Sequence, residues 1–206
     1  MRLSKQRTAE NHRRIVEAAT RLFRQHGFDR VGVAELMREA GFTHGGFYNH
    51  FESKEALAAE ACEQVFARVN AELAKRLQPK TGSAWQNYVA EYLSPDRVSV
   101  PSDDAALATL AADASREGQQ VQSTFAAGID ATLNTLATYL VERTPRSART
   151  PRRAARAQAV QRLSALVGAC VLARAVQTAS PDLSKEILAA NVERGRGSSR
   201  SRRPKR

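Results

Sequence analysis

The sequence predicts an all-α fold, in which an N-terminal helix-turn-helix domain of three helices precedes a larger C-terminal helical domain. Three observations predict it. Apolar residues recur every three to four positions along successive segments, which is the period of an amphipathic helix. Ala and Leu make up much of the 42% of residues that are hydrophobic, and both favour helices over strands. Gly and Pro gather at the boundaries between these segments.

The first two predicted helices each carry one apolar face. The first covers residues 8–26 and ends at Gly27, and the second covers Val33–Ala40 and ends at Gly41. A glycine directly after a helix is typical of a left-handed C-cap. Residues 1–7 are polar and basic, and we expect them to fray, as is common for an arm that touches a phosphate backbone.

A third, short helix follows within a few residues, with Thr43 as its expected N-cap. Because the connection is so short, the two helices must turn sharply, which is the geometry of a helix-turn-helix. Phe47 and Phe51 are four residues apart and would anchor this helix to the preceding ones. The other face is small and polar, with Gly45, Gly46, Tyr48 and Asn49.

Two adjacent glycines in a helix need a physical reason, because each costs about 1 kcal/mol relative to alanine. One reason is close approach of the backbone to a bulky partner such as a DNA phosphate strand. We favour this interpretation for Gly45, which faces outward. For Gly46, tight packing against neighbouring helices explains the residue equally well.

Several segments of the N-terminal quarter of the chain form a pattern in fixed order and spacing: Ile15–Ala19, Leu22-Phe23, Gly27-Phe28, Val33–Met37, Ala40-Gly41 and Gly46–Leu57. This pattern resembles, with no gap, the DNA-binding domain of the TetR/AcrR family of bacterial transcriptional repressors. One departure is Gly32, because the family usually caps its second helix there with Thr or Ser. Gly is an acceptable cap, but a phosphate contact from that hydroxyl is lost.

The resemblance implies a DNA-binding domain over residues 1–53 and a set of DNA contacts. In this interpretation Asn49, His44 and Thr43 reach base edges, while Tyr48, His50 and Lys54 hold phosphates. The start of the first helix meets the phosphate backbone through Arg7 or Arg13, although a solvated basic face explains either arginine equally well. The full set of expected contact residues is Arg7, Arg13, Val33, Thr43, His44, Gly45, Tyr48, Asn49, His50 and Lys54.

Residues 54–194 are predicted to form a second helical domain. Its first helix covers residues 54–77 with an apolar stripe, and Pro79–Gly82 marks its end. Residues 94–102 hold two Ser-Pro or Pro-Ser pairs and are expected to form a loop. The further predicted helices cover residues 83–93, 103–117, 119–143, 154–178 and 183–192.

In the TetR/AcrR family this second domain binds a small-molecule effector and dimerises, so the resemblance implies both roles here. Four aromatic residues are candidates for lining an effector pocket, although each is more simply explained as core: Trp85, Tyr88, Tyr92 and Phe125. By analogy with the family, the terminal helix pair forms half of a four-helix dimer interface. The candidate interface residues are Val160, Leu163, Ser164, Val167, Gly168 and Val171.

The formal net charge of +11 points to a polyanionic partner, but the charge is unevenly distributed. Basic residues cluster at 143–156 and again at 194–206. Residues 195–206 are too polar to bury a core and are expected to be disordered. We therefore expect a ligand-responsive dimeric regulator, most simply a repressor that binds a pseudo-palindromic operator. The alternative is a helical protein that binds polyanions without regard to sequence and uses these basic segments.

The sequence carries no signature of an enzyme, cofactor or metal site. It has neither a phosphate-binding glycine loop ending in Lys-Ser/Thr nor a nucleophile elbow. His44 and His50 are six residues apart and would point about 120° away from each other on one helix. Cys62 and Cys170 lie in apolar helical patterns and are expected to be buried free thiols. We expect no signal segment, no membrane span and a cytoplasmic protein.

Overall fold

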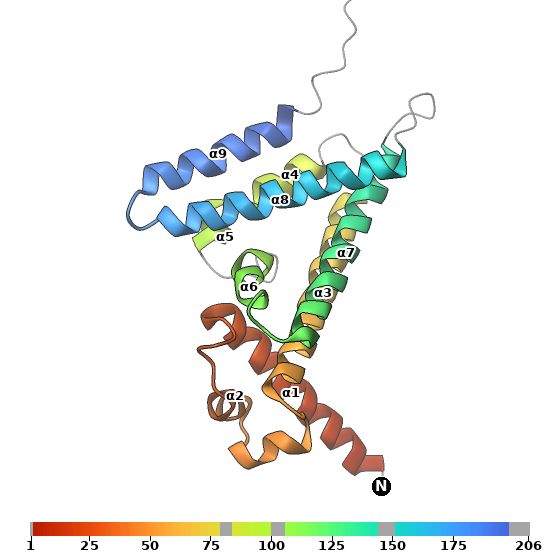
Figure 1. Cartoon of the computed structure of the whole chain (residues 1–206), viewed down its shortest axis with the longest axis vertical. Helices are drawn as coiled ribbons and strands as arrows, with labels where there is room; N and C mark the ends of the chain where they lie inside the picture. The colour runs from red at the N-terminus through yellow and green to blue at the C-terminus, as the bar shows by residue number, and fades with distance from the viewer. Residues whose placement is uncertain (1, 79–83, 100–105, 144–150, 198–206) are drawn as a thin grey trace, which may run out of the picture. The chain divides into compact units, whose positions relative to one another are not determined.

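The computed structural model describes residues 2–78, 84–99, 106–143 and 151–197, and every regular element in these ranges is helical (Figure 1). The predicted all-α class is therefore confirmed. The elements are α1 (Arg2–His26), α2 (Val33–Ala40), η1 (His44–Asn49), α3 (Lys54–Leu77), α4 (Ala84–Tyr92), α5 (Pro95–Ser99), α6 (Ala106–Ala114), α7 (Gln119–Glu142), α8 (Arg152–Val176) and α9 (Pro181–Gly197).

The chain forms two compact units that share three helices, α3, α6 and α7. The first unit comprises Met1–Arg68 and Thr109–Gly128, and the second comprises Val69–Ala108 and Ile129–Arg206. Both α3 and α7 therefore begin in the first unit and continue into the second. The predicted boundary between residues 53 and 54 falls at the start of α3, whereas the first segment of the first unit extends into α3 as far as Arg68.

The first unit is built around a core of apolar side chains from α1, α2, η1 and the start of α3. Ile15, Leu36, Phe47 and Leu57 are completely buried, one from each of these elements. The predicted glycine caps are confirmed, because Gly27 and Gly41 adopt left-handed backbone angles with φ of 79° and 82°. These turns redirect the chain so that successive helices pack around one core.

Two segments that we expected to be irregular are helical. α1 begins at Arg2, so residues 2–7 extend the helix and do not fray from it. The expected loop at residues 94–102 contains α5, in which the Val98 amide donates to the Ser94 carbonyl at 3.0 Å. Pro95 is the first residue of this helix, where its missing N–H removes no helical hydrogen bond.

The second unit packs α4, α8 and α9 around its own core. Figure 1 shows α8 and α9 running side by side, and α4 also contacts α9. Leu93, Leu136, Ala159 and Cys170 are among its most deeply buried residues. The core holds a polar link as well, because the backbone amide of Trp85 donates a hydrogen bond to the Tyr139 hydroxyl at 3.3 Å.

The last helix is longer than predicted. α9 runs from Pro181 to Gly197, whereas the pattern predicted its end near residue 192 and a disordered tail from residue 195. Gly195 lies against α4, where a β-carbon would be 3.5 Å from the Val89 side chain. This packing accounts for the continued helix. The rest of the predicted tail, residues 198–206, lies outside the described residues.

By length and composition alone, α8 could cross a membrane, although it contains Arg162 and Arg174 and is no uninterrupted apolar run. The sequence of α8 explains its high hydropathy. Its apolar residues are frequent, and its charged residues lie in its first turns and at Arg162 and Arg174. A single helix of this kind is weak evidence for a membrane, since core helices pass the same test.

Candidate nucleic-acid interface

The predicted short helix is present as a 3-10 helix, η1. Its backbone bonds span three residues, from the Gly46 amide to the Thr43 carbonyl at 3.1 Å and from the His50 amide to the Phe47 carbonyl at 2.9 Å. Thr43 occupies the predicted N-cap position, but its side chain makes no capping hydrogen bond. Two adjacent glycines weaken the α-helical preference here, which favours a short, tightly wound turn.

The two faces of η1 have the character that the sequence predicts. Phe47 is completely buried and Phe51 is 6% exposed, with their ring centroids 5.7 Å apart. Tyr48 is 68% exposed and meets Phe47 only edge-on. The other outward residues are exposed as well, namely Thr43, His44, Gly45 and Asn49. The phenylalanines therefore hold η1 in place while its polar groups are open to a partner.

The two glycines of η1 differ in their surroundings. A β-carbon at Gly45 would meet nothing within 4 Å. A β-carbon at Gly46 would lie 3.5 Å from the terminal methyl of Met37, which is an ordinary contact. Packing within the protein therefore requires a glycine at neither position.

The remaining expected contacts lie at the edges of this surface. Lys54 is the first residue of α3 and is half-buried, as are His50 and Val33. Ser53 caps α3, because its hydroxyl oxygen accepts a hydrogen bond from the Ala56 amide at 3.0 Å. We did not predict this cap, although a serine directly before a helix is a recognisable signal for it.

The two expected arginines of α1 have different environments. Arg7 is exposed. Arg13 is also exposed but forms ion pairs along its own helix, with Glu10 at 2.5 Å and Glu17 at 4.0 Å. These pairs compete with phosphate for its guanidinium, although exposed pairs of this kind contribute only about 0.2–1 kcal/mol.

Arg14 has a structural role that sequence reasoning missed. Its guanidinium donates a hydrogen bond to the Ala40 carbonyl at 3.0 Å and lies 4.9 Å from the ring centroid of Phe42. It therefore ties α1 to the turn between α2 and η1. No periodic pattern reveals this contact, because its partners are 26 and 28 residues away in sequence.

A histidine pair lies beneath the end of η1. His12 on α1 contacts the Glu60 carboxylate at 2.8 Å and stacks on Phe51, with centroids 4.4 Å apart. The His50 ring lies 6.0 Å from that of His12. Burial, with a smaller contribution from His12, lowers the pKa of His50 below 6.5. Within the described residues, this cluster is not a metal site, since no three His, Cys, Asp or Glu side chains converge.

The structure brings together only part of the predicted effector pocket. Trp85, Tyr88 and Tyr92 are buried in the second unit and border one small cavity there. Phe125 belongs to the first unit, where it meets Phe66 edge-on with centroids 5.1 Å apart. The four aromatic residues therefore do not form a single group, because Phe125 lies on the part of α7 that joins the first unit.

Most of the expected interface residues of α8 are open. Val160 is 44% exposed and Val171 is 42% exposed. Ser164 is exposed, Val167 is half-buried, and a β-carbon at Gly168 would meet nothing within 4 Å. Leu163 differs, because it packs against the core of the second unit.

Both cysteines are buried free thiols, as expected. Burial raises the pKa of Cys62 to about 12, with smaller contributions from Glu117 and Glu63. Burial also raises the pKa of Cys170. Neither thiol ionises near neutral pH, which makes both poor nucleophiles.

Comparison with known proteins matches one segment of the first unit to a family. Residues 15–61 match the family model described as bacterial regulatory proteins, tetR family. The chain is 44% identical over 54 residues to the uncharacterized HTH-type transcriptional regulator YerO of Bacillus subtilis, covering 26% of this chain and 19% of YerO. It is 37% identical over 66 residues to the A-factor receptor protein of Streptomyces griseus, covering 32% of this chain and 24% of the receptor. The matches thus span about a fifth to a quarter of these relatives.

The structural similarity to solved proteins extends beyond residues 15–61. The crystal structure of reduced Escherichia coli NemR superposes with a TM-score of 0.75, covering 91% of this chain and 96% of NemR at 21% identity. At this identity the likeness shows the fold. The relatives themselves are DNA-binding regulators and not enzymes. Residues 15–61 thus carry the helix-turn-helix of the tetR family of bacterial regulatory proteins, and the chain shares the fold of NemR.

Proposed function

We propose that this protein is a cytoplasmic, homodimeric repressor that binds a pseudo-palindromic operator and is released by a small-molecule effector. The observation that carries the proposal is the two-faced η1 segment. Its aromatic side chains are buried, while Thr43, His44, Gly45, Tyr48 and Asn49 are exposed. A segment held this way presents polar groups to a groove without disturbing its own core.

In this proposal η1 enters the major groove. Asn49, His44 and Thr43 read base edges, because amide, imidazole and hydroxyl groups all exchange hydrogen bonds with bases. Tyr48 and Lys54 hold phosphates on either side of the groove. Gly45 lets the η1 backbone approach the DNA closely, which is supported by the open space around it.

The phosphate contacts continue onto neighbouring helices. Arg7 and Arg13 approach the backbone from α1, His50 from the end of η1 and Val33 from the first turn of α2. Arg13 must exchange its pairs with Glu10 and Glu17 for a phosphate, at little cost because all three groups are exposed.

Dimerisation uses the exposed stripe of α8 that contains Val160, Ser164, Val167 and Val171, with Gly168 and Leu163 at its edges. Two copies then present their η1 segments about 34 Å apart, one turn of DNA. An effector releases the operator only if it binds more tightly to a state whose η1 segments do not fit successive grooves.

The test is selection of bound fragments from a random DNA pool at about 150 mM salt, where phosphate contacts alone are weak. The proposal predicts recovery of one short inverted repeat. Recovery of no motif would overturn it in favour of sequence-indifferent polyanion binding. A chain lacking residues 198–206 separates the two functions further, since a repressor keeps its operator preference without these residues whereas a tail-dependent binder loses its affinity for DNA.

A further inference from the structure

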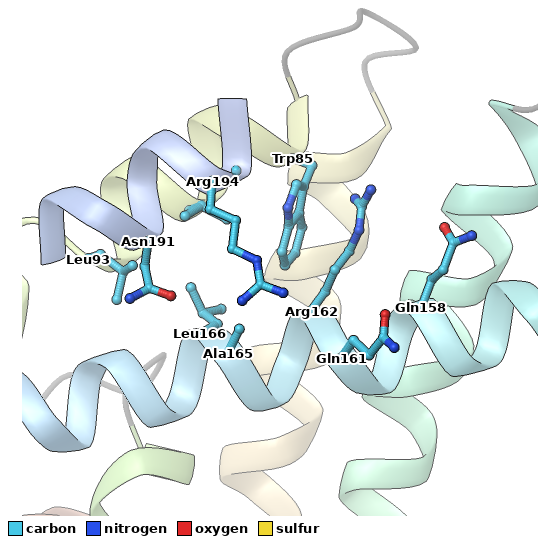
Figure 2. A pocket seen from close by; sticks show the side chains of 11 residues that line it. Trp85, Leu93, Gln158, Gln161, Arg162, Ala165, Leu166, Asn191 and Arg194 are labelled. Atoms are coloured by element: carbon cyan, nitrogen blue, oxygen red, sulfur yellow. The ribbon is translucent and has the colours of Figure 1, made fainter. Parts of the chain in front are cut away.

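A cavity of about 240 Å³ lies between α4, α8 and α9, separate from the DNA-reading segment (Figure 2). This is the volume of about eight liquid waters, enough for a one-ring or short-chain organic molecule. All the residues that line it belong to the second unit. The cavity includes Trp85 but otherwise shares only Leu166 with the small cavity bordered by Tyr88 and Tyr92.

The lining is polar and positively charged at one end. Arg162 projects from α8 beside Trp85, and Arg194 reaches from α9 toward α8 (Figure 2). The amide side chains of Gln158, Gln161 and Asn191 complete the polar lining, which contains no carboxylate. Among the described residues, no Asp or Glu forms an ion pair with either arginine. The cavity therefore holds two guanidinium groups without a protein counter-ion.

The Arg162 guanidinium is half-buried and its carbon lies 5.3 Å from the ring centroid of Trp85. Burial lowers the pKa of this arginine. Removing a charge from water is costly unless an opposite charge or hydrogen-bond acceptors compensate it. An anion in the cavity would supply that compensation, and guanidinium groups match carboxylates in geometry.

The rest of the lining is apolar. Val89 and Leu93 come from α4 and its end, and Ala165 and Leu166 come from α8. These side chains and the face of Trp85 suit a hydrocarbon group. The arrangement of charge at one end and apolar surface beside it is the pattern expected of a site for an amphipathic ligand.

We propose that this cavity binds a small organic acid, whose carboxylate lies between Arg162 and Arg194 and whose hydrocarbon part packs against Trp85 and Leu166. As the chemical class of the effector, this inference rests on the proposed function. Binding to the cavity itself does not depend on DNA and is tested without it.

The cavity and the proposed dimer surface use different sides of α8. At about 100° per residue, Gln158, Arg162 and Ala165 point about 140–160° away from Val160, and Gln161 about 100° away. The open stripe of Val160 and Val171 lies within about 20° of one direction. A dimer formed through this stripe therefore leaves the α8 wall of the cavity free to contact a ligand.

Trp85 is the only tryptophan of the chain, so its fluorescence reports directly on the cavity. The full-length protein is titrated with benzoate, cyclohexanecarboxylate and octanoate up to about 10 mM, with excitation that selects tryptophan, and binding is confirmed by calorimetry. Benzyl alcohol, cyclohexanemethanol and 1-octanol serve as matched neutral compounds. We expect saturable binding of at least one acid, at least about tenfold tighter than its alcohol.

Arg162→Gln and Arg194→Gln should each weaken binding of that acid about tenfold or more, since each removes a charged hydrogen-bond donor. The matched control is Arg153→Gln, which removes an exposed arginine of the same helix that does not line the cavity. Circular dichroism verifies that each variant is folded. Equal binding of acids and alcohols, unchanged affinity in both cavity variants, or no saturable binding of any acid would overturn the inference. Failure to select an operator would instead contradict the proposed function, and it would not affect the binding of acids to the cavity, which is measured without DNA.

Discussion

Arg14 and Ala40 connect α1 to the end of α2 through a single hydrogen bond of 3.0 Å, donated by the guanidinium to the backbone carbonyl. The same guanidinium covers the ring of Phe42. The bond satisfies a carbonyl in the last turn of α2, where no intrahelical amide is available. Arg14 thereby fixes the turn from which η1 departs.

Replacement of Arg14 by Ala should destabilise the folded protein by about 1–2 kcal/mol, because it removes a charged hydrogen bond and the contact with Phe42. Urea unfolding followed by circular dichroism measures the change. Arg13→Ala is the matched control, since Arg13 makes only exposed pairs, and it should cost no more than about 0.5 kcal/mol. Equal stability of the two variants would contradict a structural role for Arg14.

Asn49→Ala and Lys54→Ala should separate base reading from phosphate binding. Loss of Asn49 should lower affinity for the selected operator by about 1–3 kcal/mol and leave random DNA nearly unaffected. Loss of Lys54 should weaken binding to both and reduce the salt slope by about one. Fluorescence anisotropy at several salt concentrations measures both effects, with Lys75→Ala as the charge-matched control. If both variants lose equal affinity on random DNA, the assigned roles are wrong.

Gly45→Ala should leave stability within about 0.5 kcal/mol of the parent, because the added β-carbon meets nothing in the free protein. Its operator affinity should fall at least about tenfold if DNA approaches the η1 backbone closely. Gly41→Ala should instead lower the stability of the folded protein, by about 1–2 kcal/mol. Gly41 has a φ of 82°, and the added β-carbon would lie 3.0 Å from a guanidinium nitrogen of Arg14. Unaltered DNA binding by Gly45→Ala would remove the argument for close approach.

Val171→Asp should convert a dimer into a folded monomer, because the residue is 42% exposed in the single chain and a charge there costs little until the surface is covered. Light scattering coupled to size-exclusion chromatography measures the mass. Ala74→Asp places the same charge on an exposed position of α3 and should remain dimeric. A monomeric parent protein, or a dimer that tolerates Val171→Asp, would contradict an interface along α8.

Operator affinity should depend on pH through His50. Burial and His12 lower its pKa below 6.5 in the free protein, so it is neutral at pH 7. A phosphate contact raises its pKa in the complex, so binding takes up a proton and affinity falls as pH rises from about 6 to 8. His50→Gln should flatten this dependence, whereas His26→Gln should not. His12 and Glu60 lie in the same cluster as His50. If the operator affinity of His50→Gln still depends on pH in the same way, the proton taken up on binding belongs to another group.

The same shift has a consequence for folding with the opposite sign. Because the folded-state pKa of His50 is lowered, its contribution to stability is fully present above the unfolded value of 6.5 and is lost as pH falls below that value and through the folded-state pKa. DNA binding and folding therefore respond to His50 in opposite directions as the solution is acidified.

The sequence predicts the helices well because they follow from local rules. The apolar stripe that begins at Leu57 predicts α3 over the residues where it is found, and Gly41 predicts its own left-handed turn. The outward face of η1 also follows from the position of Phe47. What the helical period alone misses is the 3-10 geometry of η1, which two adjacent glycines favour by weakening the α-helical preference.

The contacts that join distant segments lie beyond such patterns. His12 and Glu60 are 48 residues apart, and each alone is an ordinary polar residue on a helix. The cavity arginines, Arg162 and Arg194, become a pair only when α8 and α9 fold side by side. Charge and aromatic content therefore indicate an effector site only in general terms, whereas its chemistry depends on the tertiary fold.

Because α3 and α7 run uninterrupted from one compact unit into the other, the chain offers no point at which the DNA-reading part can be detached cleanly. A cut after residue 53 removes the part of α3 whose Leu57 completes the core around Phe47, and a cut after residue 68 severs a helix in mid-course. The two parts are therefore expected to melt in a single cooperative transition, and exchange of effector domains between relatives should succeed only where the shared helices are inherited whole.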